Sequence, residues 1–351
     1  MKLGFLIETN VPPAVEGVPA NEYIAHSVEQ FLREGAAAEA AGFDSLHVPE
    51  RHMRPECHFP TPLQLLTALA ARTNRIRLNT HTLILTLYHP MQVAEQSAMI
   101  DMLSRGRHTL TVAMGYLPLY WRMIGATGDG RRERFIESVE ILRLAFAGKP
   151  FSFHGRHFTL EDVILTPPPY QGERFPLWLA GHFEKTMQRA AVYGDGWAGN
   201  PFPQELQSWN ARVNAYREAA AKNGRKALVC CARDAWVGAT HAEAMRTFRT
   251  HEEHYIREMR FYFRKGILRH PDFGSEADIT LERLLPHMVI GSASECAERL
   301  QQHAEQYQLD HCVLRLRMPR GPGFQETLDA IALCGEAIIP AVQGREAAPA
   351  V

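Results

Sequence analysis

The chain has little net charge, no long apolar run and few cysteines, and each absence excludes a class of protein. Its 38 basic and 39 acidic residues leave a net charge of −1, so no excess of positive charge favours a nucleic acid partner. No apolar run is long enough to cross a bilayer, and the start at Met1 reads as a strand instead of a signal peptide. Six cysteines occur without a CxxC pair, so we expect reduced thiols and a cytoplasmic protein.

Several catalytic signatures are also missing. No Gly-x-Gly-x-x-Gly follows an expected strand, which argues against a Rossmann dinucleotide-binding domain. No Gly-x-Ser-x-Gly and no HExxH motif occurs, so serine-hydrolase and zincin functions lack their signatures. The hydrophobic fraction of 46% is normal for a globular protein with a large core.

Strand and helix patterns alternate along nearly the whole chain. Eight apolar segments have strand character, and right-handed crossovers between them make a parallel sheet that can close into a barrel. We therefore predict an α/β protein with a (β/α)8 TIM barrel, forming one domain over residues 1–345 with a short disordered tail over 346–351. The expected strands are 3–7, 43–48, 76–87, 108–114, 177–180, 195–198, 227–237 and 311–316. The expected helices include 21–41, 61–72, 131–147 and 183–193, and one that begins at His89 and ends before Gly106.

Two segments are longer than a minimal βα unit requires. Residues 151–160 predict an inserted hairpin, and three prolines follow at 167–169. Residues 240–286 predict a helical insertion before the last strand, with large apolar side chains at helical spacing. That stripe indicates a helix packed on the barrel, and the alternative is a lid or an oligomer contact over the cleft. It comprises Met245, Phe248, Tyr255, Met259, Tyr262 and Phe263.

Charged side chains follow the second expected strand. The apolar segment 43–48 leads to Glu50, Arg51 and His52. A charge away from water must be paired or must bind something, and the C-terminal ends of barrel strands meet at the functional cleft. The cluster could be a surface salt-bridge group, a metal site with the cysteine and histidine that follow, or a catalytic or cofactor-contacting group. The spacing matches no usual zinc pattern, so we predict no metal and favour the third interpretation.

Three other strand ends carry features of a binding site. Polar side chains at 79–82 indicate either a solvated strand edge or backbone presented to a ligand. Gly115 and the aromatic residues after it indicate either core packing or the wall of an apolar pocket. Gly181 joins a strand to a helix, where backbone N–H groups can approach a phosphate, although one glycine is a weak signal.

Several segments agree in order and spacing with one known family. The chain resembles the bacterial luciferase-like flavin monooxygenases over about residues 1–200 and, more loosely, 286–340. The series is specific as a set, whereas any single segment is not. The matching segments are AGFDSLHVPERH, RIRLNTHTLILTLYHPMQVAEQSAMIDMLSRGR, TVAMGYLPLYW, RERFIESVEIL, FSFHGRHF, PPPYQGERFPLWLAG, AAVYGDGW and IGSASECAERL.

The resemblance implies a (β/α)8 barrel, often dimeric, with a flavin at its C-terminal mouth. Many members take reduced FMN from a separate NADH- or NADPH-dependent flavin reductase, and a flavin hydroperoxide formed with oxygen then oxygenates the substrate. We therefore expect a homodimeric, two-component FMN-dependent monooxygenase of a small apolar organic substrate. Other members bind a 5-deazaflavin coenzyme and transfer hydride, so a deazaflavin-dependent dehydrogenase or reductase is the alternative. A non-catalytic flavin-binding protein is a third possibility.

The resemblance also implies roles for the residues after the second strand. Glu50 falls where the family places a carboxylate near the isoalloxazine ring. His52 falls on one of two paired imidazole positions, and we expect it to hydrogen-bond or protonate the peroxide. Arg51 replaces the other histidine of the luciferases proper, so we expect no luminescence and an electrostatic role toward the anionic flavin.

Further cofactor contacts are implied at the later strand ends. The family's non-prolyl cis peptide would fall near His81 and Thr82. Met114 stands where luciferases have a phosphate-contacting arginine, so Arg131 or Arg134 would compensate, together with the backbone of 181–183. The expected cofactor-binding residues are Glu50, Thr80, His81, Thr82, Met114, Gly115, Arg131, Arg134, Ala180, Gly181, His182, Phe183 and Trp197. The expected substrate pocket comprises Tyr116, Leu117, Trp121 and His58.

Overall fold

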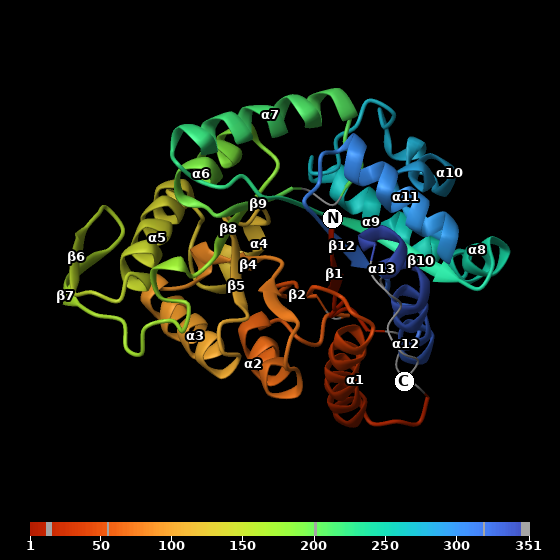
Figure 1. Cartoon of the computed structure of the whole chain (residues 1–351), viewed down its shortest axis with the longest axis horizontal. Helices are drawn as coiled ribbons and strands as arrows, with labels where there is room; N and C mark the ends of the chain where they lie inside the picture. Colours follow the sequence, from red (N-terminus) through yellow and green to blue (C-terminus); the bar gives the residue numbers. More distant parts are fainter. Residues whose placement is uncertain (12–15, 55, 200–201, 319, 345–351) are drawn as a thin grey trace.

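The strands close into a barrel, as the sequence pattern predicts (Figure 1). The computed structural model describes residues 1–11, 16–54, 56–199, 202–318 and 320–344. Within them, eight parallel strands pair in a ring whose last member returns to the first. Around the ring these are β1 (Lys2–Leu6), β2 (Ser45–Val48), β3 (Arg77–Thr80), β5 (His108–Ala113), β8 (Leu177–Ala180), β9 (Gly196–Ala198), β10 (Val229–Gly238) and β12 (His311–Arg315). Each predicted strand segment therefore contains one strand of the barrel.

Helices surround the barrel in Figure 1, and the predicted ones are confirmed to within two residues at each end. They are α1 (Ala20–Ala40), α2 (Pro62–Arg72), α3 (Pro90–Leu103), α5 (Arg131–Phe146) and α6 (Glu184–Tyr193). Gly42, with a φ of 91°, turns the chain out of α1 at a position that favours glycine. The other helices are α4 (Pro118–Met123), α7 (Leu206–Lys222), α8 (His241–Arg249), α9 (Glu252–Arg264), α10 (Leu281–Leu284), α11 (Ala293–Gln306), α12 (Phe324–Leu333) and α13 (Ile339–Gln343). None of the described helices is both long and apolar enough to cross a membrane.

The third strand is shorter than the pattern predicts. The segment 76–87 holds the third strand as predicted, but only in its first part: β3 ends at Thr80, and the short strand β4 (Leu83–Ile84) and a 3-10 turn at Leu85–Leu87 follow. The peptide bond between His81 and Thr82 is cis, at the place that the family resemblance implies. The N–H of Ile84 donates to the Glu50 carboxylate at 2.5 Å. A side chain therefore replaces strand pairing as the partner of this backbone group.

Both predicted insertions are present. The hairpin consists of the antiparallel strands β6 (Phe151–His154) and β7 (Thr159–Val163). Between β10 and β12 the insertion carries α8, α9, α10 and the unpredicted strand β11 (Val289–Ser292), which pairs with β10. Phe248, Tyr255 and Met259 of the aromatic stripe are buried, so the packing interpretation is confirmed for these side chains. The predicted tail at 346–351 lies outside the described residues.

The barrel interior contains a polar column where TIM barrels normally hold branched aliphatic side chains. The hydroxyl of Ser45 lies 2.8 Å from Nε2 of His47 and 2.9 Å from Nε2 of His311. The His81 ring stands edge-on to His47 at 5.2 Å, one layer nearer the mouth. Burial lowers the pKa of all three imidazoles, to about 4 in His81 and about 3 in His311. The column is therefore uncharged at neutral pH.

Candidate active site

Glu50 and His52 form a hydrogen-bonded pair just beyond the C-terminal end of β2. The Glu50 carboxylate accepts the Tyr88 hydroxyl at 2.7 Å, in addition to the N–H of Ile84. Nε2 of His52 lies 2.5 Å from the same carboxylate. Burial, with Glu50 beside it, raises the pKa of Tyr88 well above its usual value, so its hydroxyl remains a donor. The carboxylate is thus fixed from three directions and orients the imidazole.

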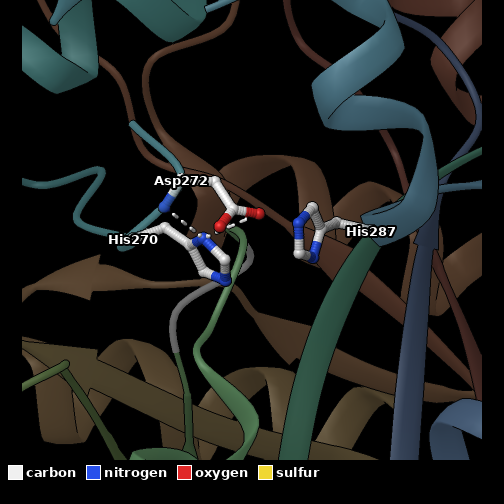
Figure 2. A group of neighbouring side chains, drawn as sticks. All are labelled: His270, Asp272 and His287. Atoms are coloured by element: carbon white, nitrogen blue, oxygen red, sulfur yellow. Dashed lines mark hydrogen bonds and ion pairs between the residues drawn. The ribbon is translucent and has the colours of Figure 1, made fainter. Parts of the chain in front are cut away.

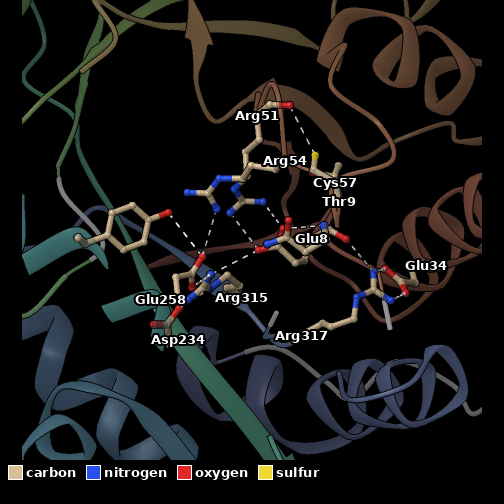
Figure 3. A network of polar contacts seen from close by, with 12 residues as sticks. Glu8, Thr9, Glu34, Arg51, Arg54, Cys57, Asp234, Glu258, Arg315 and Arg317 are labelled. Atoms are coloured by element: carbon tan, nitrogen blue, oxygen red, sulfur yellow. Dashed lines mark hydrogen bonds and ion pairs between the residues drawn. The ribbon is translucent and has the colours of Figure 1, made fainter. Parts of the chain in front are cut away.

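Arg51 points to the other side of the mouth and pairs with Glu8, directly after β1 (Figure 3). Both nitrogens of the guanidinium fork bond the Glu8 carboxylate, with Nη2 at 3.0 Å from Oε2. Burial alone would raise the pKa of Glu8, but Arg51 and Arg315 hold it below its usual value of 4.5. The charge of Arg51 is therefore already balanced within the fold.

Arg315 extends this pairing into a buried network (Figure 3). Its guanidinium lies 2.6 Å from Asp234, 2.9 Å from Glu258 and 3.4 Å from Glu8. Glu258 also faces Arg54 at 3.7 Å. Burial opposes the charge of Arg315, yet these carboxylates raise its pKa well above the usual value. The network joins β1, β10, β12 and α9, so it fixes the helical insertion to the barrel mouth.

The centre of the mouth is narrow. A cavity of about 90 Å³ lies among side chains that include Arg51, His81 and Asp234. The rings of Phe202 and Tyr262 border it, tilted at 45° to each other with their centroids 4.5 Å apart. Organic ligands usually occupy about 300 to 1,000 Å³. The cavity at this point is therefore smaller than the usual space for an organic ligand.

A larger cleft of about 480 Å³ opens beside His52. Its apolar wall includes Leu117 and Phe261, and Arg54 stacks over the Phe261 ring at 5.3 Å. The full lining is His52, Met53, Arg54, Glu56, Leu117, Leu119, His254, Arg257, Glu258, Phe261, Arg264 and Arg320. The imidazole of His52 therefore borders a space in which an organic molecule can lie against carbon.

The predicted phosphate-binding loop between β8 and α6 borders a third cavity, of about 870 Å³. His182 and Phe183 line it directly. Gly181 has a φ of 155°, and a Cβ there would lie 2.7 Å from Thr186, so the loop requires glycine. The indole N–H of Trp197 donates to the Gly181 carbonyl at 3.0 Å. Trp197 is fully buried, so it supports this loop from below.

The expected contacts on the third and fourth strands lie close together. Thr80 donates to the Thr111 carbonyl at 2.7 Å and accepts the Thr111 N–H at 2.8 Å, which ties β3 to β5. The Met114 carbonyl accepts the Thr86 hydroxyl at 2.9 Å. Gly115 has a φ of 79°. These residues build the barrel rim, and only His81 of this group lines the narrow cavity.

Arg131 and Arg134 are occupied by neighbouring groups. The Arg131 guanidinium lies over the Trp121 ring at 5.2 Å. Arg134 donates to the carbonyls of Thr86 and Tyr88, each at 3.2 Å. Arg134 therefore holds the segment that carries Tyr88 in place.

The expected substrate-pocket residues do not converge on one space. Leu117 lines the cleft beside His52, and Tyr116 lies near the ring of Tyr262 at 6.5 Å. Trp121 is buried and donates to Thr86 at 3.2 Å, so it is a packing residue. His58 contacts the ring of Tyr23 at 6.0 Å, on the side of α1.

Sequence reasoning missed Glu8, Tyr88, Arg315 and Glu258. Glu8 carried a usable signal, because a polar residue directly follows the apolar strand β1, as Glu50 follows β2. Arg315 lies inside an apolar strand, where a charge must have a partner. Glu258 belongs to the amphipathic α9, and nothing in the helical pattern separates it from a solvated residue.

One group of side chains has metal-ligand chemistry (Figure 2). Ligand atoms of His270, Asp272 and His287 all lie within 4.8 Å of one another. The Nδ1 of His270 accepts the Asp272 N–H at 3.2 Å. Burial, with His270 and Arg233 nearby, lowers the pKa of His287 to about 4. Two histidines and one carboxylate form a ligand set that zinc or iron accepts in other proteins, but Asp272 is exposed and Nδ1 of His270 is used by a backbone N–H, so we assign no metal here.

The comparisons with known proteins agree with this geometry. Residues 1–311 match the sequence pattern of the luciferase-like monooxygenases. The chain belongs to this family. RslO1, a monooxygenase from Streptomyces bottropensis, superposes with a TM-score of 0.82 at 22% identity, over 97% of this chain and 99% of that one. The oxygenating constituent of 3,6-diketocamphane monooxygenase from Pseudomonas putida, in complex with FMN, gives 0.80 at 17% identity, over 97% and 98%.

Curated relatives in the luciferase-like family include enzymes of a second kind. The F420-dependent glucose-6-phosphate dehydrogenase of Beutenbergia cavernae is 32% identical over 57% of this chain and 62% of its own length. Protein y4wF of Sinorhizobium fredii is 34% identical over 49% of this chain, and the match spans about half of that protein (50%). Luciferase-like membership therefore establishes an oxidoreductase fold and leaves flavin and deazaflavin chemistry to be decided by the site.

Proposed function

We propose that this protein is the oxygenating component of a two-component monooxygenase. It takes reduced FMN from a separate NAD(P)H-dependent reductase and uses O₂ to oxygenate a small organic molecule. The observation that carries the proposal is the Glu50–His52 pair, which borders a cleft of about 480 Å³ beside the barrel mouth. The structural likeness to a monooxygenase with bound FMN supports the choice of cofactor. A cytoplasmic homodimer that meets its reductase transiently completes the proposal.

The residues at the mouth fit a flavin. Nδ1 of His81 is buried and has no hydrogen-bond partner among the described residues, so it can meet a polar edge of the ring. The Gly181 backbone can approach a phosphate closely, since no side chain intervenes. When bound, reduced FMN supplies the electrons and the reaction with oxygen, whereas the protein supplies binding, orientation and exclusion of water.

His52 is the group that this arrangement assigns to proton transfer. Glu50 holds the imidazole at Nε2, and the T-shaped contact with Tyr120, at 5.6 Å between ring centroids, fixes the plane of the ring. The ring lines the cleft, so it can give a proton to a bound group or retain one near it. Arg51 is assigned a positioning role, because Glu8 already balances its charge. Leu117 and Phe261 give the cleft an apolar wall beside this point, against which a bound substrate would help to exclude water.

The test is coupling in His52→Ala. The variant is expected to bind FMN like the wild type, while product per reduced flavin falls by about 10²-fold and hydrogen peroxide rises, as loss of a general acid–base group predicts. Oxygen consumption and peroxide would be measured with reduced FMN and a panel of apolar substrates. His154→Ala, on the exposed hairpin, is the matched control and is expected to stay coupled. Unchanged coupling in His52→Ala would remove His52 from the mechanism.

A deazaflavin-dependent dehydrogenase is the second candidate, favoured by the 32% identity to an F420-dependent enzyme. It predicts tight binding of the deazaflavin coenzyme, weak binding of FMN and substrate oxidation without oxygen. Titration of the protein with each cofactor under argon shows which one it binds tightly. Product formation from substrate under argon then separates the two functions, because only the monooxygenase needs oxygen for product.

A further inference from the structure

The cavity beside the β8–α6 loop is lined by cations that lack acidic partners. Arg212 of α7 and Arg269, after α9, both line it. Neither has a carboxylate oxygen within 4.0 Å among the described residues. Glu205 is the one acidic residue of the lining, and its carboxylate accepts the N–H groups of Gln207 and Ser208 at the start of α7. The wall therefore carries two guanidinium groups against one carboxylate, which leaves net positive charge beside a space of about 870 Å³.

Arg212 is held firmly without being neutralised. It donates to the carbonyl of His182 at 2.9 Å, to the side-chain oxygen of Gln204 at 2.9 Å and to the carbonyl of Ser208 at 3.1 Å. All three acceptors are uncharged. Their bonds fix the direction of the guanidinium and leave its formal charge in place, which suits recognition of an anion by a preorganised group.

Arg269 and His182 complete the wall. Among the described residues, Arg269 donates one hydrogen bond, from Nε to the Gly266 carbonyl at 2.7 Å. Its two terminal nitrogens are not used in that bond. Nδ1 of His182 is buried and has no hydrogen-bond partner among the described residues. Burial, with Arg212 and Arg269 nearby, lowers the pKa of His182 to about 4. The ring is therefore neutral at pH 7 and has one N–H to donate.

We propose that Arg212, Arg269 and His182 form a subsite for an oxyanion, a phosphate or carboxylate group carried by a ligand that reaches the barrel mouth. The proposal rests on the proposed function only in that such a ligand is cofactor or substrate. It explains how the chain can hold a phosphate with Met114 at the position of the family's arginine. Arg131 lies over the Trp121 ring and Arg134 holds the carbonyls of Thr86 and Tyr88, and neither of them lines this cavity.

The first experiment compares the dissociation constants of FMN and riboflavin, which differ by the phosphate alone. In the wild type FMN is expected to bind at least about tenfold more tightly, since a charge-assisted bond is involved. Arg269→Met and Arg212→Met are expected to weaken FMN by about tenfold or more and to leave riboflavin unchanged. Arg212→Lys, which retains the charge, should recover part of the loss. Arg249→Met, about half exposed on α8 and outside this cavity and the cleft beside His52, is the matched control.

The second experiment uses inorganic phosphate alone, at an ionic strength matched with chloride, and measures the melting temperature. Phosphate is expected to raise it in the wild type and in Arg249→Met, and not in Arg269→Met. If protection by phosphate depends on Arg269 but the preference for FMN over riboflavin does not, the subsite would be assigned to an acidic substrate. Protection without any flavin binding would keep the subsite and overturn the proposed function. Two results together would overturn the subsite. Phosphate would not raise the melting temperature, and the preference for FMN over riboflavin would be unchanged in Arg269→Met and Arg212→Met, or would be lost in Arg131→Met instead.

Discussion

Arginines on the two sides of the barrel mouth have opposite environments. On the β1–β12 side, Arg51 and Arg315 lie against carboxylates, and each has at least one within 3.0 Å. On the β8–α7 side, Arg212 and Arg269 bond only neutral oxygens among the described residues. The first pair is neutralised within the fold, whereas the second retains charge toward a cavity.

The difference teaches how to distinguish a structural charge from a binding charge. A buried charge must be compensated, so a guanidinium that is paired with carboxylates reports on folding. A guanidinium that is oriented by carbonyls and faces a cavity has no carboxylate to balance its charge, and an anionic ligand can provide that negative charge. Residue type alone gives the same label to both, because all four are arginines.

The largest effect is expected on the paired side. Glu8→Gln would leave Arg51 and Arg315 without one of their carboxylates, and removing one member of a buried pair typically costs about 3–5 kcal/mol. Urea unfolding at pH 7 measures the loss. Glu29→Gln is the matched control, since the pair of Glu29 with Arg72 is about half exposed and such pairs contribute about 0–1 kcal/mol. Equal losses in the two variants would contradict the structural role of the network.

The stabilisation that Glu8 contributes should be lost in acid. The pKa of Glu8 is lowered in the folded state from 4.5, so its stabilisation is complete above 4.5 and is lost as the pH falls through the lower folded value. The gap in unfolding free energy between wild type and Glu8→Gln should therefore narrow below pH 4.5. A gap that stays constant in acid would show that Glu8 acts through packing and not through its charge.

The barrel was predictable from the sequence because its signals are local and repeated. Strand 43–48 and the polar residues after it indicated the mouth, where the hydrogen bond between Glu50 and His52 lies. The partners of these residues were not predictable. Tyr88 reaches Glu50 only because strand β3 ends at Thr80 and the chain turns away from the sheet. Glu258 bonds Arg315 although the two residues are 57 positions apart in the sequence. Such pairings depend on how helices dock on the barrel, and periodicity does not encode docking.

A middle-sized effect is expected at His182, on the unpaired side. Its pKa falls from 6.5 to about 4 on folding, so the unfolded chain takes up a proton as the pH drops below 6.5 and folding loses free energy down to about pH 4. The shift corresponds to at most about 3 kcal/mol. In His182→Gln the loss of stability between pH 6.5 and 4 should shrink by up to that amount, as measured by urea unfolding at several pH values. His154→Gln, exposed on the hairpin, should keep the wild-type slope.

The phosphate contacts show where motif transfer ends. The family resemblance placed a phosphate near Gly181 to Phe183, and His182 and Phe183 do border a large cavity. It could not identify Arg212 or Arg269, because one lies on α7 and the other follows the insertion helix α9, where the chain shows no matching motif. Only the packing of three distant segments brings them to the same wall.

The smallest effect on stability is expected for Arg269→Met. A small effect here would distinguish the two sides of the mouth most clearly. The residue is exposed and makes one bond to a neighbouring carbonyl, so its loss should change the unfolding free energy by no more than about 0.5 kcal/mol. A loss of several kcal/mol, as at Glu8, would mean that Arg269 has a structural partner and that the two sides of the mouth are alike. A stability that rises slightly at low ionic strength and converges with the wild type in high salt would identify repulsion that a bound anion normally removes.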